Sequence, residues 1–208
     1  AIRDLDPAAP DLEGYLFPDT YDLTRKTDPA ADLVARMVKR FREVITPELP
    51  GVQASGMSLR EVVTLASVVE LETARVAERP RIAAVFRNRL RIRMPLQTDP
   101  TVIYALRKLG TYDGNIRRVD LAVDSPYNTY RYPGLPPGPI ASPGRDAIRA
   151  VLQPAAVRDL YFVSRNDGSH EFSANLADHN RAVTRYQRNR SAAGPSAAAP
   201  AATPPPGR

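Results

Sequence analysis

Two glutamates, Glu70 and Glu72, stand at the end of the apolar run ASVVELET, and their spacing turns them toward different sides of a helix. At 100° per residue, Glu70 falls among the apolar side chains, whereas Glu72 falls about 200° away, at an edge where water is expected. A carboxyl group buried among apolar side chains has a raised pKa and stays protonated, as a general acid requires. The alternative is a structural ion pair of Glu70 with an arginine of the next segment, namely Arg79, Arg87 or Arg89.

A polar trio precedes the next apolar stretch, in the sequence MPLQTDPTVIYAL. Asp99 is expected to cap a helix whose first residue is Pro100. Capping does not account for Gln97 and Thr98, whose side chains can form hydrogen bonds with a polar ligand. We therefore predict that Gln97 and Thr98 contribute to a binding site.

A loop rich in proline and glycine, residues 124–144, carries tyrosines and an asparagine. Long ordered loops are uncommon and often functional. This loop is either a stiff connector or a wall of a binding site, where tyrosine rings stack on sugar rings and an amide forms two hydrogen bonds. The second interpretation predicts that the candidate binding residues face Glu70; these are Gln97, Thr98, Tyr127, Asn128 and Tyr130.

The composition argues against several other kinds of site. The chain has no cysteine and only two histidines, His170 and His179, which are expected to be structural, so we expect no metal site and no cofactor. The net charge of +6 suits a polyanionic partner, but the arginines form no basic block, which argues against nucleic acid. No stretch of the sequence approaches the ~20 apolar residues of a membrane span.

The elements that must position these residues are mainly helices. Apolar periodicity, proline starts and the capping box of Ser58 and Glu61 predict helices near 29–45, 58–73, 78–92, 99–109, 144–153 and 175–188. Residues 12–23 are predicted to be a strand broken by Pro18, and Asn166-Asp167-Gly168 predicts a hairpin turn. The predicted fold class is α+β, a helix-dominated single domain with small β-hairpin elements.

The sequence divides into three predicted parts. Residues 1–10 are interpreted as the remnant of an N-terminal linker, and 11–190 as the folded domain. Residues 191–208 contain almost only Ala, Pro, Gly and Ser and are predicted to be a disordered tail. Because the sequence begins without an initiator Met, we expect it to be a fragment of a protein that starts earlier.

Six blocks stand in order along residues 11–186: LEGYLFPDTY, ASVVELET, ERPRIAAVFRNRL, MPLQTDPTVIYAL, YNTYRYPGLPPGPIASPG and LYFVSRNDGSHEFSANLADHN. Together they resemble the endolytic murein transglycosylases of the MltG/YceG-like family. The resemblance implies a bacterial enzyme that cleaves the MurNAc-β-1,4-GlcNAc bond of nascent peptidoglycan, leaves a 1,6-anhydro-MurNAc end and limits glycan strand length. It also implies that Glu70, the first glutamate of the V-E-x-E-T block, is the general acid and base.

The same resemblance implies a location and partners. The family's proteins are held in the inner membrane by one N-terminal helix, with the catalytic domain on the periplasmic side. Peptidoglycan strands are the implied substrate, and cell-wall synthases are implied partners. The resemblance further implies that the membrane anchor and most of a preceding LysM-like subdomain lie outside this sequence. It also implies a charged residue in many relatives at the position of Leu71.

Two other functions fit the same residues. A glycoside hydrolase needs a second carboxylate at a defined separation from the first, and Asp19, Glu72 or Asp99 could supply it. A non-catalytic module would bind peptidoglycan and keep Glu70 in an ion pair. The products separate these functions, because a lytic transglycosylase leaves a 1,6-anhydro end, a hydrolase leaves a reducing end, and a binding module leaves no product.

Overall fold

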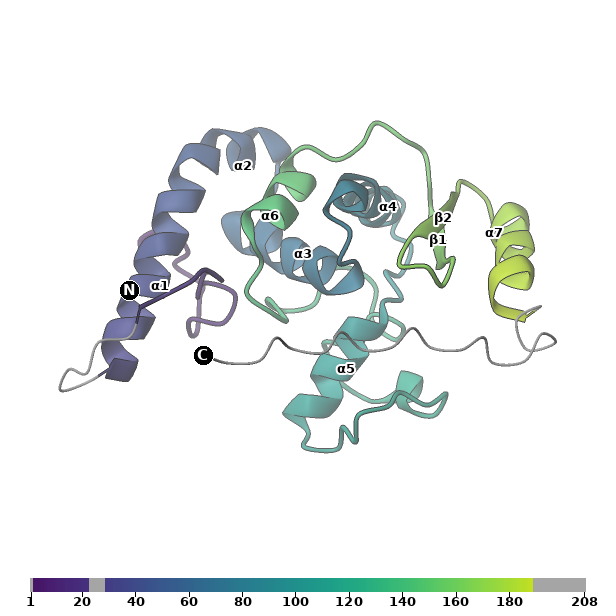
Figure 1. The fold of residues 1–208 in the computed structure, drawn as a ribbon, viewed down its shortest axis with the longest axis horizontal. Coiled ribbons are helices and arrows are strands. Elements are labelled where there is room, and N and C mark those ends of the chain that lie inside the picture. The colour runs from purple at the N-terminus through teal and green to yellow at the C-terminus, as the bar shows by residue number, and fades with distance from the viewer. Residues whose placement is uncertain (1, 23–28, 189–208) are drawn as a thin grey trace, which may run out of the picture.

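The computed structural model describes residues 2–22 and 29–188, and Figure 1 shows the arrangement of its elements. The helices are α1 (Pro29–Ile45), α2 (Leu49–Ser55), α3 (Leu59–Glu72), α4 (Arg79–Arg91), α5 (Asp99–Lys108), α6 (Arg145–Leu152) and α7 (Leu176–Val183). The strands β1 (Tyr161–Ser164) and β2 (His170–Ser173) form an antiparallel pair. The predicted tail, residues 191–208, lies outside the described residues. The α+β, helix-dominated fold class is confirmed.

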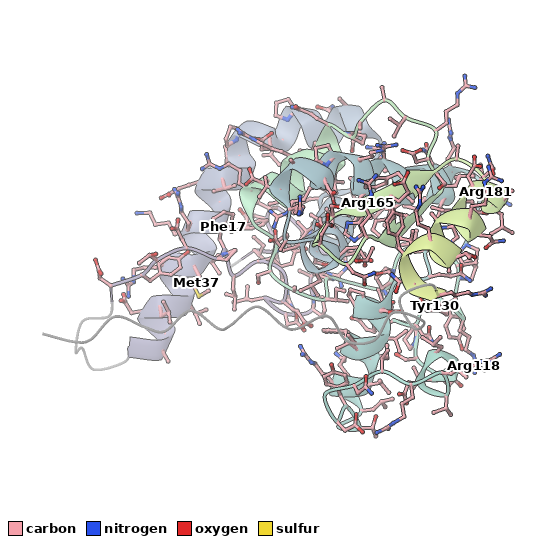
Figure 2. All side chains as sticks on the ribbon, turned by 45° about the vertical axis from the view of Figure 1, so that its right-hand side comes forward. Phe17, Met37, Arg118, Tyr130, Arg165 and Arg181 are labelled. Atoms are coloured by element: carbon pink, nitrogen blue, oxygen red, sulfur yellow. The ribbon has the colours of Figure 1, made fainter. Side chains whose placement is uncertain are left out.

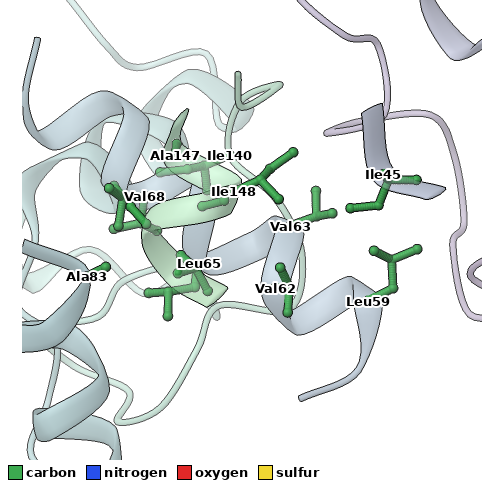
Figure 3. Close-up of a cluster of buried hydrophobic side chains, with 14 of the residues drawn as sticks. Ile45, Leu59, Val62, Val63, Leu65, Val68, Ala83, Ile140, Ala147 and Ile148 are labelled. Atoms are coloured by element: carbon green, nitrogen blue, oxygen red, sulfur yellow. The ribbon is translucent and has the colours of Figure 1, made fainter. Parts of the chain in front are cut away.

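Helix α3 is the central element of the fold. It packs against α2, α4, α5 and α6, and every side chain from Val62 to Val69 is buried. Figure 3 shows part of the resulting hydrophobic cluster, in which side chains of α3 meet those of α6 and of the preceding loop; they include Leu65, Val68, Ile140, Ala147 and Ile148. A helix that is apolar on all sides is typical of such a buried position.

The start of α3 is held by the predicted capping box. The Ser58 hydroxyl accepts a hydrogen bond from the backbone N–H of Glu61, and the Glu61 carboxylate accepts one from the backbone N–H of Ser58. These two bonds satisfy backbone donors that a helix start leaves without partners. The rotation of α3 about its axis is therefore fixed both by the buried core and by the capped first turn. This rotation sets the directions in which Glu70 and Glu72 point.

Two segments differ from the sequence-based expectation. Helix α2 was not predicted, because it contains a proline and a glycine; the proline lies in its first turn, where the missing N–H costs nothing. The predicted strand at 12–23 is not a strand in its described part, residues 12–22. This part packs on α1 through side chains, with the ring of Tyr15 placed 5.2 Å from that of Phe41, edge to face.

The first residues pack with the domain. Ile2 and Ala9 are buried and belong to the hydrophobic core, and buried Asp6 accepts a hydrogen bond from the hydroxyl of Tyr15. Residues 2–10 therefore form part of the domain surface and core, which corrects their interpretation as a linker remnant. Residues 2–10 contain too few apolar residues for a periodic pattern to predict this packing.

The described residues contain no helix that is both long enough and apolar enough to cross a membrane.

The central position of α3 predicts a large cost for shortening its side chains. Leu65→Ala removes a fully buried side chain, so we expect the free energy of unfolding to fall by about 2–5 kcal/mol, measured by urea denaturation. Leu71→Ala is the matched control on the same helix, because Leu71 is 49% exposed and should change stability much less. Equal losses for the two variants would contradict the central placement of α3.

Candidate active site

The two glutamates at the end of α3 lie in different surroundings. Glu72 lines a cleft of about 470 Å³, whereas Glu70 is not among the residues that line it. The cleft is bounded by the segment before α5, the proline-rich loop, the β1–β2 hairpin and α7. In Figure 2, Tyr130 of the proline-rich loop lies between α5 and α7, at this cleft.

Glu72 is a partly buried carboxyl group with one hydrogen bond from a neighbouring side chain. The hydroxyl of buried Thr98 donates to Oε2 of Glu72 over 2.7 Å. Burial raises the pKa of Glu72, and Asp99 raises it further, whereas the hydrogen bond from Thr98 and the nearby side chains of His170 and Arg89 lower it. A raised carboxyl pKa in a cleft is the property expected of a general acid.

The segment that carries Gln97 and Thr98 is held in an unusual backbone conformation. Gln97 has a φ of 50°, a left-handed conformation that costs a non-glycine residue about 1–2 kcal/mol. The backbone N–H of Gln97 donates to the carbonyl oxygen of Thr129, and the N–H of Thr98 donates to the Thr129 hydroxyl, both over 3.2 Å. The proline-rich loop therefore positions the segment that contacts Glu72.

A buried arginine of α4 holds both walls of the cleft. Arg89 donates from Nη1 to the carbonyl oxygen of Leu96 and from Nε to that of Leu160, over 2.7 Å each. Its guanidinium group also lies 5.3 Å from the ring centre of Tyr161, which lines the cleft from β1. Arg89 thus connects the segment before α5 with the strand on the opposite side.

Tyr130 and Asp99 form a polar pair at the cleft. The Tyr130 hydroxyl donates to Oδ1 of Asp99 over 2.6 Å. Burial raises the pKa of the Tyr130 phenol, and the hydrogen bond to Asp99 raises it further. The phenol is therefore protonated at neutral pH and offers its ring face to a ligand while its oxygen is held in place.

Asn128 has a structural position. Its side chain is fully buried, and its amide nitrogen donates to the carbonyl oxygens of Leu121 and Val123 over 3.0 and 2.8 Å. Its amide oxygen accepts a hydrogen bond from the backbone N–H of Tyr130. Asn128 folds the proline-rich loop and so places Tyr130 at the cleft, but it is not among the lining residues.

Tyr127 also lies away from the cleft. Its ring is 4.6 Å from that of Tyr104, and the ammonium group of Lys108 lies 5.5 Å from its centre. Of the predicted binding residues, Gln97 and Tyr130 line the cleft and Thr98 contacts its carboxylate. The structure thus brings three of the five together, and it brings them to Glu72.

Glu70 is in the ion pair that the sequence left open as an alternative. Its Oε1 accepts a hydrogen bond from buried Arg79, and its Oε2 accepts one from the backbone N–H of Gly144 over 2.9 Å. These contacts connect the end of α3 with the starts of α4 and α6. The expectation that the candidate binding residues face Glu70 is corrected, because Gln97, Thr98 and Tyr130 lie at Glu72 and the other two lie away from the cleft.

Several cleft residues had no signal in the sequence analysis. Tyr161, His170 and His179 come from the hairpin and α7, about 90 or more residues after Glu72. No local sequence pattern predicts that residues so far apart in the chain line the same cleft. The helical wheel places Glu72 at a solvent-facing edge, because it assumes that α3 is apolar on one side only. The nearly unbroken apolar run of α3 could have indicated a helix that is buried on all sides.

The ion pair of Glu70 predicts a structural cost for its removal. Glu70→Gln leaves the buried guanidinium group of Arg79 without its carboxylate, so we expect a loss of about 1–3 kcal/mol in the free energy of unfolding by urea denaturation. Glu43→Gln is the control, because Glu43 pairs with Arg40 at the exposed surface and should change stability little. A stable Glu70→Gln protein would show that the pair does not support the fold.

The raised pKa of Glu72 predicts a pH-dependent stability. The folded protein binds this proton more tightly than the unfolded chain, so the contribution of Glu72 to stability falls as the pH rises through the window between the ordinary and the raised pKa. Glu72→Gln removes this titration. We expect the stability of Glu72→Gln relative to the wild type to increase from acidic to neutral pH, measured by urea denaturation at several pH values. A difference that is constant with pH would contradict the raised pKa.

The sequence matches known proteins along most of its length. The endolytic murein transglycosylase of Bacillus subtilis strain 168 is 39% identical over 175 residues, which cover 84% of this chain and 48% of that protein. The protein of the same name from Streptococcus pneumoniae D39 is 37% identical over 181 residues, covering 84% and 32%. This chain therefore spans about half or less of the length of these curated relatives.

A solved structure and a family match agree with these relatives. The crystal structure of a YceG-like protein from Listeria monocytogenes superposes with a TM-score of 0.73 at 40% identity, covering 82% of this chain and 54% of that one. The YceG-like family matches residues 2–185. A match of this extent includes α3, the segment before α5, the proline-rich loop and the hairpin, so this chain belongs to the YceG-like family.

Proposed function

We propose that this domain is a peptidoglycan lytic transglycosylase and that Glu72 is its general acid and base. The observation that carries the proposal is the partly buried Glu72 carboxyl, with its raised pKa, in a cleft lined by polar and aromatic side chains. The names of the curated relatives support peptidoglycan as the substrate. Because peptidoglycan lies outside the cytoplasmic membrane, the proposed activity places the domain on the extracytoplasmic side.

The proposed reaction needs one carboxyl group that acts twice. Protonated Glu72 donates its proton to the glycosidic oxygen between N-acetylmuramic acid (MurNAc) and N-acetylglucosamine (GlcNAc) as the bond breaks. Positive charge develops at the anomeric carbon of MurNAc, and ionised Glu72 then takes the proton of the 6-hydroxyl of the same sugar. The 6-oxygen closes the 1,6-anhydro ring, so the proton count balances and no water is consumed.

The neighbours of Glu72 suit both steps. Burial favours the protonated carboxyl before the reaction, and the hydrogen bond from the Thr98 hydroxyl stabilises the carboxylate after the proton has left. The rings of Tyr130 and Tyr161 provide apolar faces for sugar rings, and the exposed amide of Gln97 can form hydrogen bonds with hydroxyl or acetamido groups. The cleft volume of about 470 Å³ is in the usual range for ligand sites.

Glu70, to which the family resemblance assigned the catalytic role, is less suited to this reaction. Both of its carboxylate oxygens have partners within the fold, in Arg79 and Gly144, and Glu70 does not line the cleft. A glycan in the cleft would therefore meet Glu72. The activities of single Glu70 and Glu72 variants separate the two assignments.

A two-carboxylate hydrolase is the second candidate, because Asp99 lines the same cleft as Glu72. A hydrolase of this kind uses one carboxyl as acid and the other as base or nucleophile. Its product has a reducing end with one added water, whereas the proposed lyase leaves a 1,6-anhydro end. Mass spectrometry of the released fragments distinguishes these products by the mass of one water molecule.

The proposal predicts the effect of removing the Glu72 proton. Glu72→Gln keeps the shape of the side chain but cannot transfer a proton, so we expect the rate of glycan cleavage to fall on the order of 10²-fold or more. The measurement is mass spectrometry of fragments released from uncrosslinked glycan strands, with 1,6-anhydro ends expected from the wild type. Glu70→Gln, assayed at a temperature where it remains folded, should keep most of its activity. An active Glu72→Gln with an inactive, folded Glu70→Gln would reverse the assignment.

A further inference from the structure

A second titratable side chain lies on the wall of the cleft, held by a carboxylate from another element. His170, the first residue of β2, lines the same cleft as Glu72. Its ring Nδ1 lies 2.6 Å from Oε2 of Glu78, and its backbone N–H donates to Oε1 of the same carboxylate over 3.1 Å. Both side chains are largely buried, with exposed fractions of 12% and 18%.

This contact fixes which ring nitrogen of His170 is available. An ionised carboxylate only accepts hydrogen bonds, so Nδ1 carries the hydrogen that points to Glu78. Among the described residues, Nε2 has no hydrogen-bond partner, and it is not among the side-chain atoms that are both buried and unpartnered. Nε2 therefore has accessible surface, and His170 is one of the residues that line the cleft.

The ring of His170 is also held by its neighbours. The rings of Phe162 and Phe172 lie 5.4 and 6.2 Å from it, both at steep angles. Two aromatic contacts and the hydrogen bond from Nδ1 to Glu78 hold the imidazole in a single orientation, and the second hydrogen bond to Glu78 holds the backbone of His170. A group that served only to connect β2 with the start of α4 would not need a ring whose second nitrogen remains open to the cleft.

We propose that His170 is a substrate-binding residue whose Nε2 forms a hydrogen bond with a polar group of the glycan. The inference rests on the proposed function, because it assigns the cleft ligand to peptidoglycan strands. Glu72 and His170 line the same cleft, and a sugar carries both donors and acceptors, so one sugar can form hydrogen bonds with both side chains. Glu78 is a positioning residue that acts through His170.

Two variants separate binding by Nε2 from the structural contact. In His170→Asn, the amide nitrogen can take the place of Nδ1 and keep the bond to Glu78, but nothing replaces Nε2. The background is Glu72→Gln, which should bind the glycan without cleaving it. The probe is a purified tetrasaccharide of alternating GlcNAc and MurNAc, and binding is measured by isothermal titration calorimetry.

We expect the added His170→Asn substitution to weaken tetrasaccharide binding about tenfold, which corresponds to the loss of one hydrogen bond, with the melting temperature nearly unchanged. Equal affinity with and without His170→Asn would overturn this proposal and leave the proposed function intact. If Glu72→Gln itself binds no tetrasaccharide, the peptidoglycan assignment fails, and the proposal fails with it. The two failures are therefore distinguishable.

Nuclear magnetic resonance of the histidine nitrogens gives a second test that does not depend on the folding of His170→Asn. The chain contains only two histidines, so the Nε2 and Nδ1 signals are few, and those of His170 can be identified from the tautomer that its contact with Glu78 imposes. In Glu72→Gln, saturation with the tetrasaccharide should shift the Nε2 resonance of His170 while its Nδ1 resonance changes little. An unchanged Nε2 resonance in the saturated complex would overturn the proposal.

Discussion

The burial of the middle of α3, from Val62 to Val69, is the constraint on which the rest of the structure depends. A helix that is covered on all sides can present polar groups only near its ends, and here the last turn carries both glutamates. Because they are two residues apart, they point in nearly opposite directions. One carboxylate is thereby available for the scaffold and the other for the cleft, and a single rigid element fixes the position of both.

The scaffold side and the cleft side of α3 use charged groups in different ways. Glu70 meets Arg79 and the start of α6, so its charge is compensated by a cation and by an N–H at a helix start. Glu72 meets a hydroxyl and has no direct ion pair; Asp99 raises its pKa, Arg89 and His170 lower it, and burial is the largest influence. A carboxylate in an ion pair stays ionised and connects elements of the fold, whereas a carboxyl group whose burial outweighs its partners has a raised pKa and can transfer a proton.

Local sequence patterns predict much of the fold and part of the candidate site. The capping box, the proline starts and the Asn-Asp-Gly turn located α3, α4, α5 and the hairpin to within a few residues, because such signals act over one turn. The direction of Asn128 and Tyr127 could not be predicted, since the backbone of an irregular loop has no fixed period. The cleft around Glu72 could not be predicted, because a helical wheel gives angles on one helix and not what surrounds it.

The contacts of Arg89 have a consequence for how the cleft can change in evolution. All of its hydrogen bonds across the cleft end on main-chain carbonyl oxygens, those of Pro95, Leu96 and Leu160. Carbonyl oxygens are present whatever side chain a residue carries. Mutations at these positions can therefore alter the side chains that line the cleft without removing the hydrogen bonds from Arg89. The spacing of the two walls therefore does not depend on the side chains at these positions, and the lining of the cleft can change in evolution while its framework stays the same.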